Sequence, residues 1–518
     1  MLIAVINLGL KSIRCIIFDE AGRKLATASR PVHTYLRSRE VEQDATEWLR
    51  LLEEVSREAA AGVGGGRVEA VAISASASCL VAVDADGRPT FPVMMVSDSR
   101  CVREVEELRN HPRFQEVAEA TGMGVTADLM LAKILWLRKH RPDVFERTRF
   151  FMSPADFLGY HLTGRAVIDA NNASKFHALP DGSGRLQYEP GLLDVVGISE
   201  EQLPAIEPIG SIIGEVSRVA GERYGLPPGA SVVLATYDAI CAVVGSGVAR
   251  VGTAAAVSGT VTSVRTLVAA PPARRPNGVH LSRWVEEEAG LAVIGGSNNL
   301  GGGLVEWHKQ AFYYDTPDDP YDLMDTEART IPPGAEGLVF LPYLLGERAP
   351  VWDSDARGVF FGLDRRHTRA HFTRSVLESA AFSTRHILEH IQAASACIDG
   401  LRFSGGMSRI PVVGEVLADV LQMPIAVPAE FETTSLGAMI IAGTALGRYR
   451  SVAEACDAVV AIERVHEPDP AVAELYAAMF ELYKDIYQRT RALQNARSEL
   501  LARFPEFLDA AVATRENL

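Results

Sequence analysis

Three glycine-containing turns in this sequence have residue types that could bind a phosphate group. Each follows a short apolar run: Asn-Leu-Gly-Leu-Lys-Ser at 7–12, Ser-Gly-Thr at 258–260 and Phe-Ser-Gly-Gly at 403–406. The third turn precedes a predicted helix at 412–421, and a helix N-terminus with backbone N–H groups favours an anion. Taken singly, each is more often an ordinary tight turn, and three in one chain make phosphate binding an equally good interpretation. The candidate phosphate-binding residues are Gly9, Lys11, Ser12, Gly259, Thr260, Gly405 and Gly406.

Asp238 is the candidate for proton transfer. It begins a predicted short helix after an apolar strand at 231–234. A carboxylate at a helix start can accept the proton of a hydroxyl group and hold a metal-bound water, while nearby N–H groups keep it ionised. The alternative is that Asp238 caps the helix, a position that Asp occupies equally well. These residues alone leave both interpretations open.

The elements around these residues alternate between strands and helices, which predicts an α/β fold. We expect strands at 3–6, 13–18, 24–28, 68–74 and 80–83, a helix at 45–61, and a turn at 84–87. Later come strands at 231–234, 254–257 and 262–264. The pattern of strand, glycine turn and strand around residue 9 is repeated around residue 259, which predicts a duplicated fold with two turns facing a cleft.

Two segments beyond these strands have their own expectations. Residues 270–277 contain three prolines and are predicted to form a surface loop. The segment from 468 onward is predicted to be helical, with Leu475, Met479, Leu482 and Ile486 at helical spacing on a face that docks.

Length and composition predict a compact protein of two lobes. The chain has 518 residues, more than one hydrophobic core usually supports. Its 66 acidic and 51 basic residues give a net charge of −15, which disfavours nucleic acid and anionic lipid as partners. The start has no leader pattern, no apolar run is long enough to span a membrane, and the six cysteines lack metal or disulfide spacing. We therefore expect a cytoplasmic protein with reduced, buried thiols.

Five further segments together resemble one enzyme family, the FGGY carbohydrate kinases. Residues 358–363 and 371–378, with seven residues between them, resemble its second signature. The other matches are 341–350 (Leu-Pro-Tyr-Leu-Leu-Gly-Glu-Arg-Ala-Pro), 132–137, 404–406 with 417–420, and 435–438. The resemblance covers residues 1 to about 490. It implies two actin-like (ribonuclease H-like) lobes, at 1–245 on the sugar side and 246–518 on the nucleotide side, with a cleft between them.

The resemblance also implies a reaction and assigns residues to it. The family transfers the γ-phosphate of ATP, with Mg²⁺, to a hydroxyl of a sugar, sugar acid or polyol. Asp238 matches the catalytic base, and Asp98 with Arg100 match a substrate-side element, where the alternative is an ion pair that fixes a strand end. Ser78 falls in the substrate strand. Asn7 and Asp238 would face the metal through water, and assembly as a homodimer stays open.

The sequence departs from the family pattern at both ends of the candidate site. Asn7 replaces an aspartate that helps to hold the magnesium shell, so metal affinity should fall. Lys11 adds a charge that could reach the phosphates, although a solvated turn lysine is favoured. Ala77, Ser78 and Val96 replace larger or more polar residues of xylulose and glycerol kinases. The pocket floor is therefore smaller-sided and less polar, which favours a bulkier or less familiar substrate than glycerol or xylulose.

Three functions remain in competition. The leading hypothesis is a kinase of a ketose such as xylulose or of a gluconate-like acid. The second is a nucleotide-binding regulator that has lost catalysis, which the substitutions at Asn7, Ala77 and Ser78 favour and Asp238 opposes. The third is a mechanical or chaperone-like ATPase, which would have no reason to carry the segments at 341–350 and 93–100.

Overall fold

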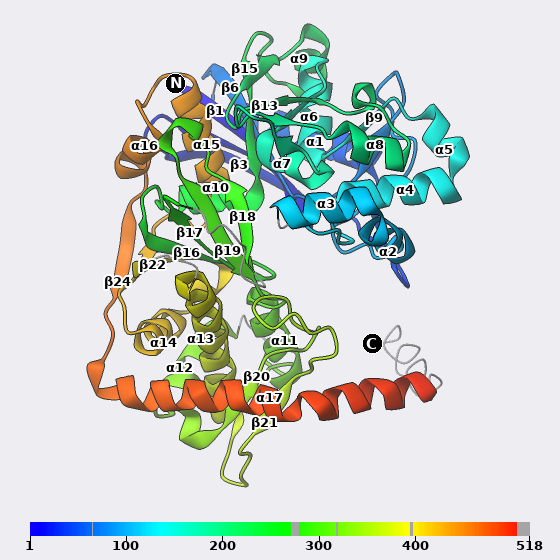
Figure 1. Cartoon of the computed structure of the whole chain (residues 1–518). Coiled ribbons are helices and arrows are strands. Elements are labelled where there is room, and N and C mark those ends of the chain that lie inside the picture. The colour runs from blue at the N-terminus through cyan, green and yellow to red at the C-terminus, as the bar shows by residue number, and fades with distance from the viewer. Residues whose placement is uncertain (65, 122, 271–278, 317–319, 394–396, 505–518) are drawn as a thin grey trace. The chain divides into compact units, whose positions relative to one another are not determined.

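A computed structural model describes residues 1–518 except 65, 122, 271–278, 317–319, 394–396 and 505–518 (Figure 1). The chain forms two compact α/β units. The first comprises Met1–Ala249, Ser282–Val293 and Glu432–Val460, and the second comprises Arg250–Leu281, Ile294–Phe431 and the chain from residue 461 onward. This division differs from the predicted lobes 1–245 and 246–518, because 282–293 and 432–460 pack with the N-terminal part. Most of the predicted loop at 270–277 lies outside the described residues.

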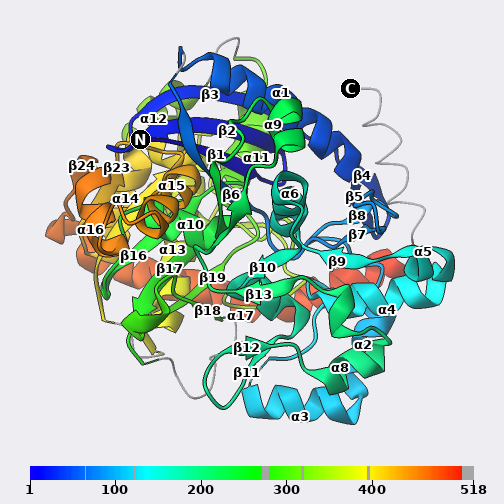
Figure 2. The same ribbon diagram turned by 90° about the horizontal axis from the view of Figure 1, so that it is seen from above.

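The first unit is built on a six-stranded sheet in the order β14-β15-β6-β1-β2-β3, of which Figure 2 labels β6, β1, β2 and β3. Its strands are β1 Leu2–Leu8, β2 Ser12–Asp19, β3 Lys24–Pro31, β6 Val68–Ala75, β14 Ile212–Glu215 and β15 Ser231–Tyr237. β1 pairs antiparallel with β2 and parallel with β6, and β6 pairs parallel with β15. β1 is an apolar run buried from its second residue onward, as expected for a strand covered on both faces. The predicted strands are confirmed.

Helix α1 Ala45–Ala61 has the predicted bounds, and Asp44 starts it by accepting a hydrogen bond from the Thr46 N–H. The other helices of this unit are α2 Val102–Asn110, α3 Pro112–Thr121, α4 Met130–His140, α5 Pro142–Arg147, α6 Pro154–Thr163, α7 Ala170–Ala173, α8 Pro190–Val196, α9 Arg218–Tyr224, α10 Asp238–Gly245, α15 Thr433–Ala445 and α16 Val452–Val459. Short strands complete it: β4 Tyr35–Arg37, β5 Glu40–Gln43, β7 Val81–Val83, β8 Val93–Met94, β9 Phe150–Met152, β10 Val167–Asp169, β11 Leu179–Pro180, β12 Leu186–Gln187 and β13 Ala205–Glu207.

Two glycines explain why α15 belongs to the first unit although it is far along the chain. α15 lies against α10 (Figure 2). A Cβ on Gly245 would lie 1.8 Å from the Thr433 carbonyl oxygen, and a Cβ on Gly437 would lie 1.8 Å from the Cys241 carbonyl oxygen. Only glycine permits two helices to approach so closely. The Ser-Leu-Gly-Ala match at 435–438 is therefore a packing motif of this unit.

The second unit repeats the same sheet pattern. Its seven-stranded sheet has the order β18-β19-β17-β16-β22-β23-β24. β16 pairs antiparallel with β17 and parallel with β22, just as β1 pairs with β2 and β6. The predicted repeat is thus confirmed within each unit. The strands are β16 Gly252–Ser258, β17 Thr262–Val268, β18 His280–Arg283, β19 Ala292–Ser297, β22 Ile398–Gly405, β23 Ile425–Pro428 and β24 Ile462–His466, with the pair β20 Val339–Leu341 and β21 Val359–Phe361.

The helices of the second unit are α11 Gly302–Phe312, α12 Tyr321–Arg329, α13 Arg369–Ala393, α14 Pro411–Leu421 and α17 Ala473–Arg503. The tail forms the predicted docked helix, α17, but the predicted face is wrong at two positions. Met479 and Ile486 are buried, whereas Leu475 and Leu482 are 42% and 39% exposed. The helix docks through an aromatic stripe instead, and its largest buried members are Tyr476, Phe480, Tyr483 and Tyr487.

Five of the six cysteines are buried free thiols, as predicted, and Cys397 is exposed, which corrects that expectation. None of the helices within the described residues is long and apolar enough to cross a membrane.

Candidate functional site

In the first unit, the candidate residues gather at one edge of the sheet. Asn7 in β1 lies opposite Ser74 in β6, and both Leu8 and Tyr237 lie opposite Ala75. Because these three strands are parallel, their carboxyl ends meet at the same edge. The Gly9 turn, residues 76–78 and Asp238 therefore emerge together, at the place where open α/β sheets bind ligands.

Asp238 is the first residue of α10, and Tyr237 holds the N-cap position without a side-chain capping bond. The alternative interpretation of Asp238 as the N-cap is therefore wrong. Its carboxylate also acts on two buried thiols nearby. Burial raises the pKa of Cys241 to about 12 and that of Cys79 to about 11, and the negative charge of Asp238 adds to both shifts. These thiols stay protonated near neutral pH, and the role of Asp238 in proton transfer stays a prediction.

A buried carboxylate that the sequence did not point to fixes the strand end before Asp238. Asp169 caps α7 and accepts a 2.9 Å hydrogen bond from the Thr236 hydroxyl, two residues before Asp238. Burial raises the pKa of Asp169, and the hydrogen bonds from Asn172 and Thr236 oppose that rise. Asp169 thereby ties β15 to α7. Its only sequence signal is an Asp before a short helix, which many structural caps share.

The turn between β1 and β2 is open on its outer side. The Gly9 N–H donates to the Ser12 carbonyl at 3.0 Å, and Ser12 begins β2. A Cβ on Gly9 would meet only the Ser12 carbonyl oxygen at 3.7 Å and the Asn7 amide oxygen at 4.0 Å. Asn7 is buried and its side-chain N–H lies 3.5 Å from the Ser435 hydroxyl, while Lys11 is exposed. The Asn7 oxygen thus borders the space beside this turn.

Ser78 is buried and has a left-handed backbone (φ 65°). Its carbonyl accepts a 2.7 Å hydrogen bond from the ammonium group of Lys133 on α4. The same ammonium donates to the carbonyls of Met95 at 2.7 Å and Met94 at 3.4 Å. Lys133 is fully buried, and burial lowers its pKa. Lys133 therefore joins the two loops that carry Ser78 and Asp98. In the sequence it stood out only as part of the family match at 132–137.

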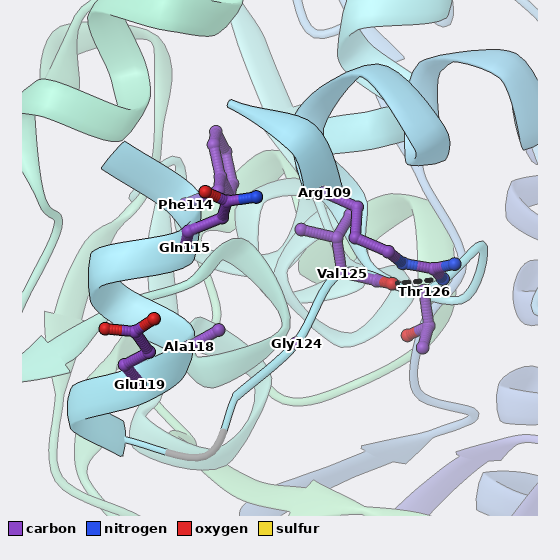
Figure 3. Close-up of a pocket in the computed structure, with 8 residues that line it drawn as sticks. All are labelled: Arg109, Phe114, Gln115, Ala118, Glu119, Gly124, Val125 and Thr126. Atoms are coloured by element: carbon purple, nitrogen blue, oxygen red, sulfur yellow. Dashed lines mark hydrogen bonds between the residues drawn. The ribbon is translucent and has the colours of Figure 1, made fainter. Parts of the chain in front are cut away.

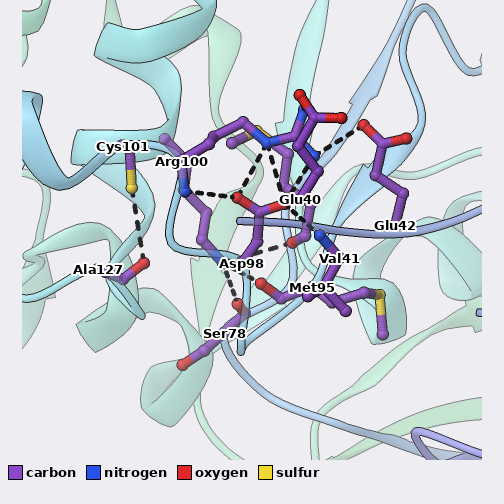
Figure 4. A network of polar contacts seen from close by, with 11 residues as sticks. Glu40, Val41, Glu42, Ser78, Met95, Asp98, Arg100, Cys101 and Ala127 are labelled. Atoms are coloured by element: carbon purple, nitrogen blue, oxygen red, sulfur yellow. Dashed lines mark hydrogen bonds and ion pairs between the residues drawn. The ribbon is translucent and has the colours of Figure 1, made fainter. Parts of the chain in front are cut away.

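Asp98 and Arg100 form the ion pair that was the alternative to a substrate contact (Figure 4). The guanidinium donates to both Asp98 oxygens and lies 2.8 Å from Glu42, and Asp98 also accepts from the Val41 N–H at 2.8 Å. The Arg100 side chain also stacks over Trp136 at 5.1 Å. This network fixes β5 to the loop after β8. A direct substrate role for the pair stays a prediction.

In the second unit, the other two glycine turns come together. Ser258 lies opposite Gly405 in the parallel pair β16–β22, so the turns that follow are adjacent. Gly405 has φ +89°, and a Cβ there would lie 2.4 Å from the Ser258 carbonyl oxygen. The space beside Gly259 and Gly406 is open, with the nearest atoms at 4.0 and 3.9 Å. Strand packing thus requires glycine at 405, and its predicted contact with a ligand stays a prediction, while Gly259 and Gly406 face open space.

A short 3₁₀ turn, Gly406–Arg409, separates β22 from α14. Helix α14 begins at Pro411, one residue before the predicted start, and ends at the predicted Leu421, so the predicted helix is confirmed. A polar pocket of about 280 Å³ lies beside this turn. Its lining residues are Ser408, Arg409, Val427, Pro428, Ala429, Phe431, Glu463 and Arg464.

Three consecutive glycines at 301–303, which the sequence analysis did not single out, support the Gly259 turn. The N–H groups of Gly301 and Gly303 donate to the Thr260 carbonyl, and the Gly302 N–H donates to the Gly259 carbonyl at 2.7 Å. A Cβ on Gly302 would lie 2.7 Å from that same oxygen. The glycine run was visible in the sequence, but its partner turn was not.

Two family models together match most of the chain. Residues 2–245 match the N-terminal domain of the FGGY family of carbohydrate kinases, and residues 254–446 match its C-terminal domain. The chain belongs to the FGGY family of carbohydrate kinases. It is therefore a phosphotransferase that acts on a hydroxyl group of a carbohydrate.

The similarity to individual members of the family extends over most of each chain. A gluconokinase of Bacillus subtilis is 25% identical over 445 residues, 84% of each chain. A xylulose kinase of the same organism is 24% identical over 498 residues, 95% of this chain and 97% of the relative. An autoinducer-2 kinase of Escherichia coli is 29% identical over 502 residues, 93% of each.

Solved structures of FGGY kinases confirm the predicted fold class. The xylulose kinase of Rhodospirillum rubrum superimposes with a TM-score of 0.86 at 26% identity and covers 96% of this chain and 100% of its own. The ligand-bound xylulose kinase of Lactobacillus acidophilus has a TM-score of 0.86 at 24% identity, over 96% and 99% of the chains.

One pocket in the first unit is lined by none of the candidate site residues. It encloses about 620 Å³ between α2, α3 and residues 124–126, and Arg109 crosses one side to donate to the Val125 carbonyl (Figure 3). Its lining residues are Arg109, Phe114, Gln115, Ala118, Glu119, Gly124, Val125 and Thr126.

Proposed function

We propose that this FGGY kinase uses ATP and Mg²⁺ to phosphorylate one hydroxyl of a small ketose such as xylulose, a sugar acid such as gluconate, or a polyol. One observation carries the proposal: Asp238, Asn7 and residues 76–78 emerge at the same carboxyl edge of one parallel sheet. The names of the relatives, gluconokinase and xylulose kinase, support the substrate class. No finding favours the alternative of a non-catalytic regulator.

Asp238 acts as the general base in this proposal. Its carboxylate accepts the proton of the attacking hydroxyl, and its place in the first turn of α10 favours the ionised form. The neighbouring thiols of Cys79 and Cys241 are too weakly acidic to compete for that role. Asp238 therefore holds the proton that leaves the sugar.

In each unit, the glycine turns that would bind ATP have room for phosphate oxygens. Gly9, Gly259 and Gly406 each border space in which a side chain would meet no atom closer than 3.7 Å. Backbone N–H groups at such turns bind phosphate oxygens without a Cβ in the way. The pocket beside Gly406 offers Arg409 and Phe431, whose side chains could stack on a nucleobase. Bound ATP supplies the phosphoryl group, and Mg²⁺ neutralises its charge.

The donors for Mg²⁺ are few. Among the described residues no group of three or more His, Cys, Asp or Glu side chains could hold a metal ion by itself. Mg²⁺ commonly keeps several waters and binds through one or two protein oxygens and substrate phosphates. The Asn7 amide oxygen and the Asp238 carboxylate would hold its waters, and this arrangement fits a metal that arrives with the nucleotide.

The sugar-side residues favour a substrate other than glycerol. Ala77 and Ser78 offer no charged or imidazole group, and the Ser78 carbonyl is occupied by Lys133. The substrate would then be recognised by Asp238 and by backbone groups at this edge of the sheet. Such groups can hydrogen-bond to a substrate that carries several hydroxyl groups.

A substrate panel tests the proposed function. ADP formation with Mg²⁺ should depend on the added sugar across ketoses, aldonates and polyols. A rate that is the same with every sugar and without sugar would favour the regulator and overturn the proposal.

The variant Asp238→Asn tests the base. Turnover should fall by roughly 10² to 10⁴, the usual contribution of a general base. ATP affinity, measured by titration, should stay within a few-fold, since Asp238 lies in the sugar-side unit. The assignment fails if the variant retains more than about a tenth of the wild-type turnover.

A further inference from the structure

The Gly-Glu-Arg-Ala-Pro segment at 346–350 has no part in the chemistry proposed above. It is nevertheless held firmly in the second unit. The Glu347 N–H donates to the Asp353 carbonyl at 2.8 Å, and the Asp353 N–H returns a 2.9 Å bond to the Glu347 carbonyl. The Glu347 side chain is 5% exposed. A buried carboxylate on a tightly fixed segment needs a partner that repays its desolvation.

The partners of the Glu347 carboxylate are two backbone N–H groups, one in its own segment and one in another loop. One carboxylate oxygen accepts from the Asn299 N–H at 2.7 Å and from the Arg348 N–H at 2.8 Å. The Arg348 guanidinium donates to the Asn298 carbonyl at 2.8 Å. Two consecutive residues of the segment thus hold two consecutive residues of the loop at 298–303.

That loop in turn holds the strand that follows the Gly259 turn. The Asn298 side-chain oxygen accepts from the Thr262 N–H at 2.8 Å, and the Asn298 N–H donates to the Thr262 carbonyl at 3.0 Å. The Asn298 amide group also donates to the Ser383 hydroxyl at 3.1 Å. Asn298 is 2% exposed, so water does not compete for these bonds.

The same loop ends in the glycines that support the turn itself. Gly302 donates to the Gly259 carbonyl at 2.7 Å, and Gly301 and Gly303 donate to the Thr260 carbonyl at 2.9 and 3.1 Å. The carbonyl groups of both turn residues are therefore hydrogen-bonded to this loop. The loop at 298–303 therefore connects the two sites: its first two residues bond to Glu347 and Arg348, and its three glycines bond to Gly259 and Thr260.

We propose that Glu347, assisted by Arg348, is a positioning residue that sets the Gly259–Thr260 turn for binding the phosphates of the nucleotide. The inference rests on the proposed function, in which this turn binds ATP. Glu347 acts only through the loop at 298–303 and touches no substrate.

Two variants of Glu347 separate the effect of its hydrogen-bond acceptor from the effect of its negative charge. Glu347→Gln keeps an oxygen that accepts from the Asn299 N–H, whereas Glu347→Leu has a similar size and no acceptor. ATP affinity is measured by calorimetry on the full chain without sugar. We expect a loss of roughly ten- to a hundredfold for Leu and less than about threefold for Gln, since a buried N–H left without an acceptor is costly.

Controls distinguish this effect from general destabilisation. Glu415→Leu removes an exposed ion pair with Arg329 in the same unit and should leave ATP affinity unchanged. Sugar affinity should be the same in all variants. Arg348→Met, which loses the bond to the Asn298 carbonyl, should weaken ATP in the same direction as Glu347→Leu.

Hydrogen exchange supplies a readout that needs no ligand. In Glu347→Leu, the amides of residues 299–303 should exchange at least tenfold faster than in the wild type, while those of α13 stay protected. If Glu347→Leu does not fold, the same measurement on Arg348→Met decides the question.

Three results would overturn the inference: unchanged ATP affinity in a folded Leu variant, an equal loss with Gln and Leu, or an equal loss for sugar and nucleotide. A wild-type chain that binds no ATP would refute the proposed function instead, and hydrogen exchange would still show whether Glu347 orders the turn.

Discussion

At the scale of single residues, Gly405 and Gly406 are adjacent but have different reasons to be glycine. A Cβ on Gly405 would lie 2.4 Å from the Ser258 carbonyl oxygen, at φ +89°, so Gly405→Ala should cost more than about 2 kcal/mol in free energy of unfolding. Gly406 borders open space. Gly406→Ala should fold normally and weaken ATP binding, because the added methyl occupies the position of the ligand.

Urea unfolding and ATP titration of the two single variants check this pair. The double variant would be uninformative, since it combines a packing clash with a ligand clash. Poorer sugar affinity with unchanged ATP affinity in Gly406→Ala would assign this turn to the sugar.

A variant at Asn7 tests whether this residue weakens the binding of Mg²⁺. Asn7→Asp places a second carboxylate near the metal, and charges about 4 Å apart interact by several kcal/mol at an effective dielectric near 20. We expect a lower Mg²⁺ concentration for half-maximal activity. If the site is instead tuned around Lys11, the new carboxylate would pair with that ammonium, and activity would fall.

The Mg²⁺ dependence of the wild type, Asn7→Asp, Lys11→Thr and the double variant distinguishes these outcomes on one substrate. Lys11 is exposed, which favours the first. Four superimposable curves would mean that neither departure from the family pattern affects catalysis.

At the scale of elements, the crossing of α10 and α15 joins segments nearly two hundred residues apart. Gly437→Ala would bring a methyl group to within 1.8 Å of the Cys241 carbonyl oxygen. Because backbone on both sides cannot yield easily, we expect a loss of about 3 kcal/mol in free energy of unfolding.

Denaturant unfolding monitored in parallel with activity measures that loss. Gly182→Ala is the matched control in the same unit, since a Cβ there would meet nothing within 4 Å. A Gly437→Ala variant as stable as this control would show that the helices can separate without cost.

At the scale of the whole molecule, Glu347 should make stability depend on pH. Burial raises the pKa of Glu347 from 4.5 to about 7, and the backbone hydrogen bonds from Arg348 and Asn299 and the Arg348 charge oppose that rise. The folded chain then binds this proton more tightly than the unfolded chain. The protonation of Glu347 therefore adds about 3 kcal/mol to the free energy of unfolding below pH 4.5. This stabilisation is lost as the pH rises through about 7.

The difference in free energy of unfolding between the wild type and Glu347→Gln isolates this effect, because Gln does not titrate. The wild type should lose stability relative to the variant between pH 4.5 and 7, and the difference should level off above that range. Parallel stability curves over the whole range would contradict the raised pKa.

The sequence by itself determined the family, the α/β class, the bounds of α1, and the three glycine turns after β1, β16 and β22. These features are local. Apolar periodicity, an N-cap such as Asp44 and the conformational demands of a turn are carried by residues close together in the chain. Motifs of the family are local strings as well, so Asp238 could be singled out before its surroundings were known.

Only the tertiary structure decided which residues meet. Gly405 must be glycine because of Ser258, Lys133 is buried because three carbonyls of other loops accept its ammonium protons, and α17 docks by its aromatic stripe and exposes Leu475. The segment 432–460 joins the first unit for the same kind of reason, through the contact of Gly437 with α10. Each is a contact between residues distant in the chain, and periodicity within one segment contains no information about its partner.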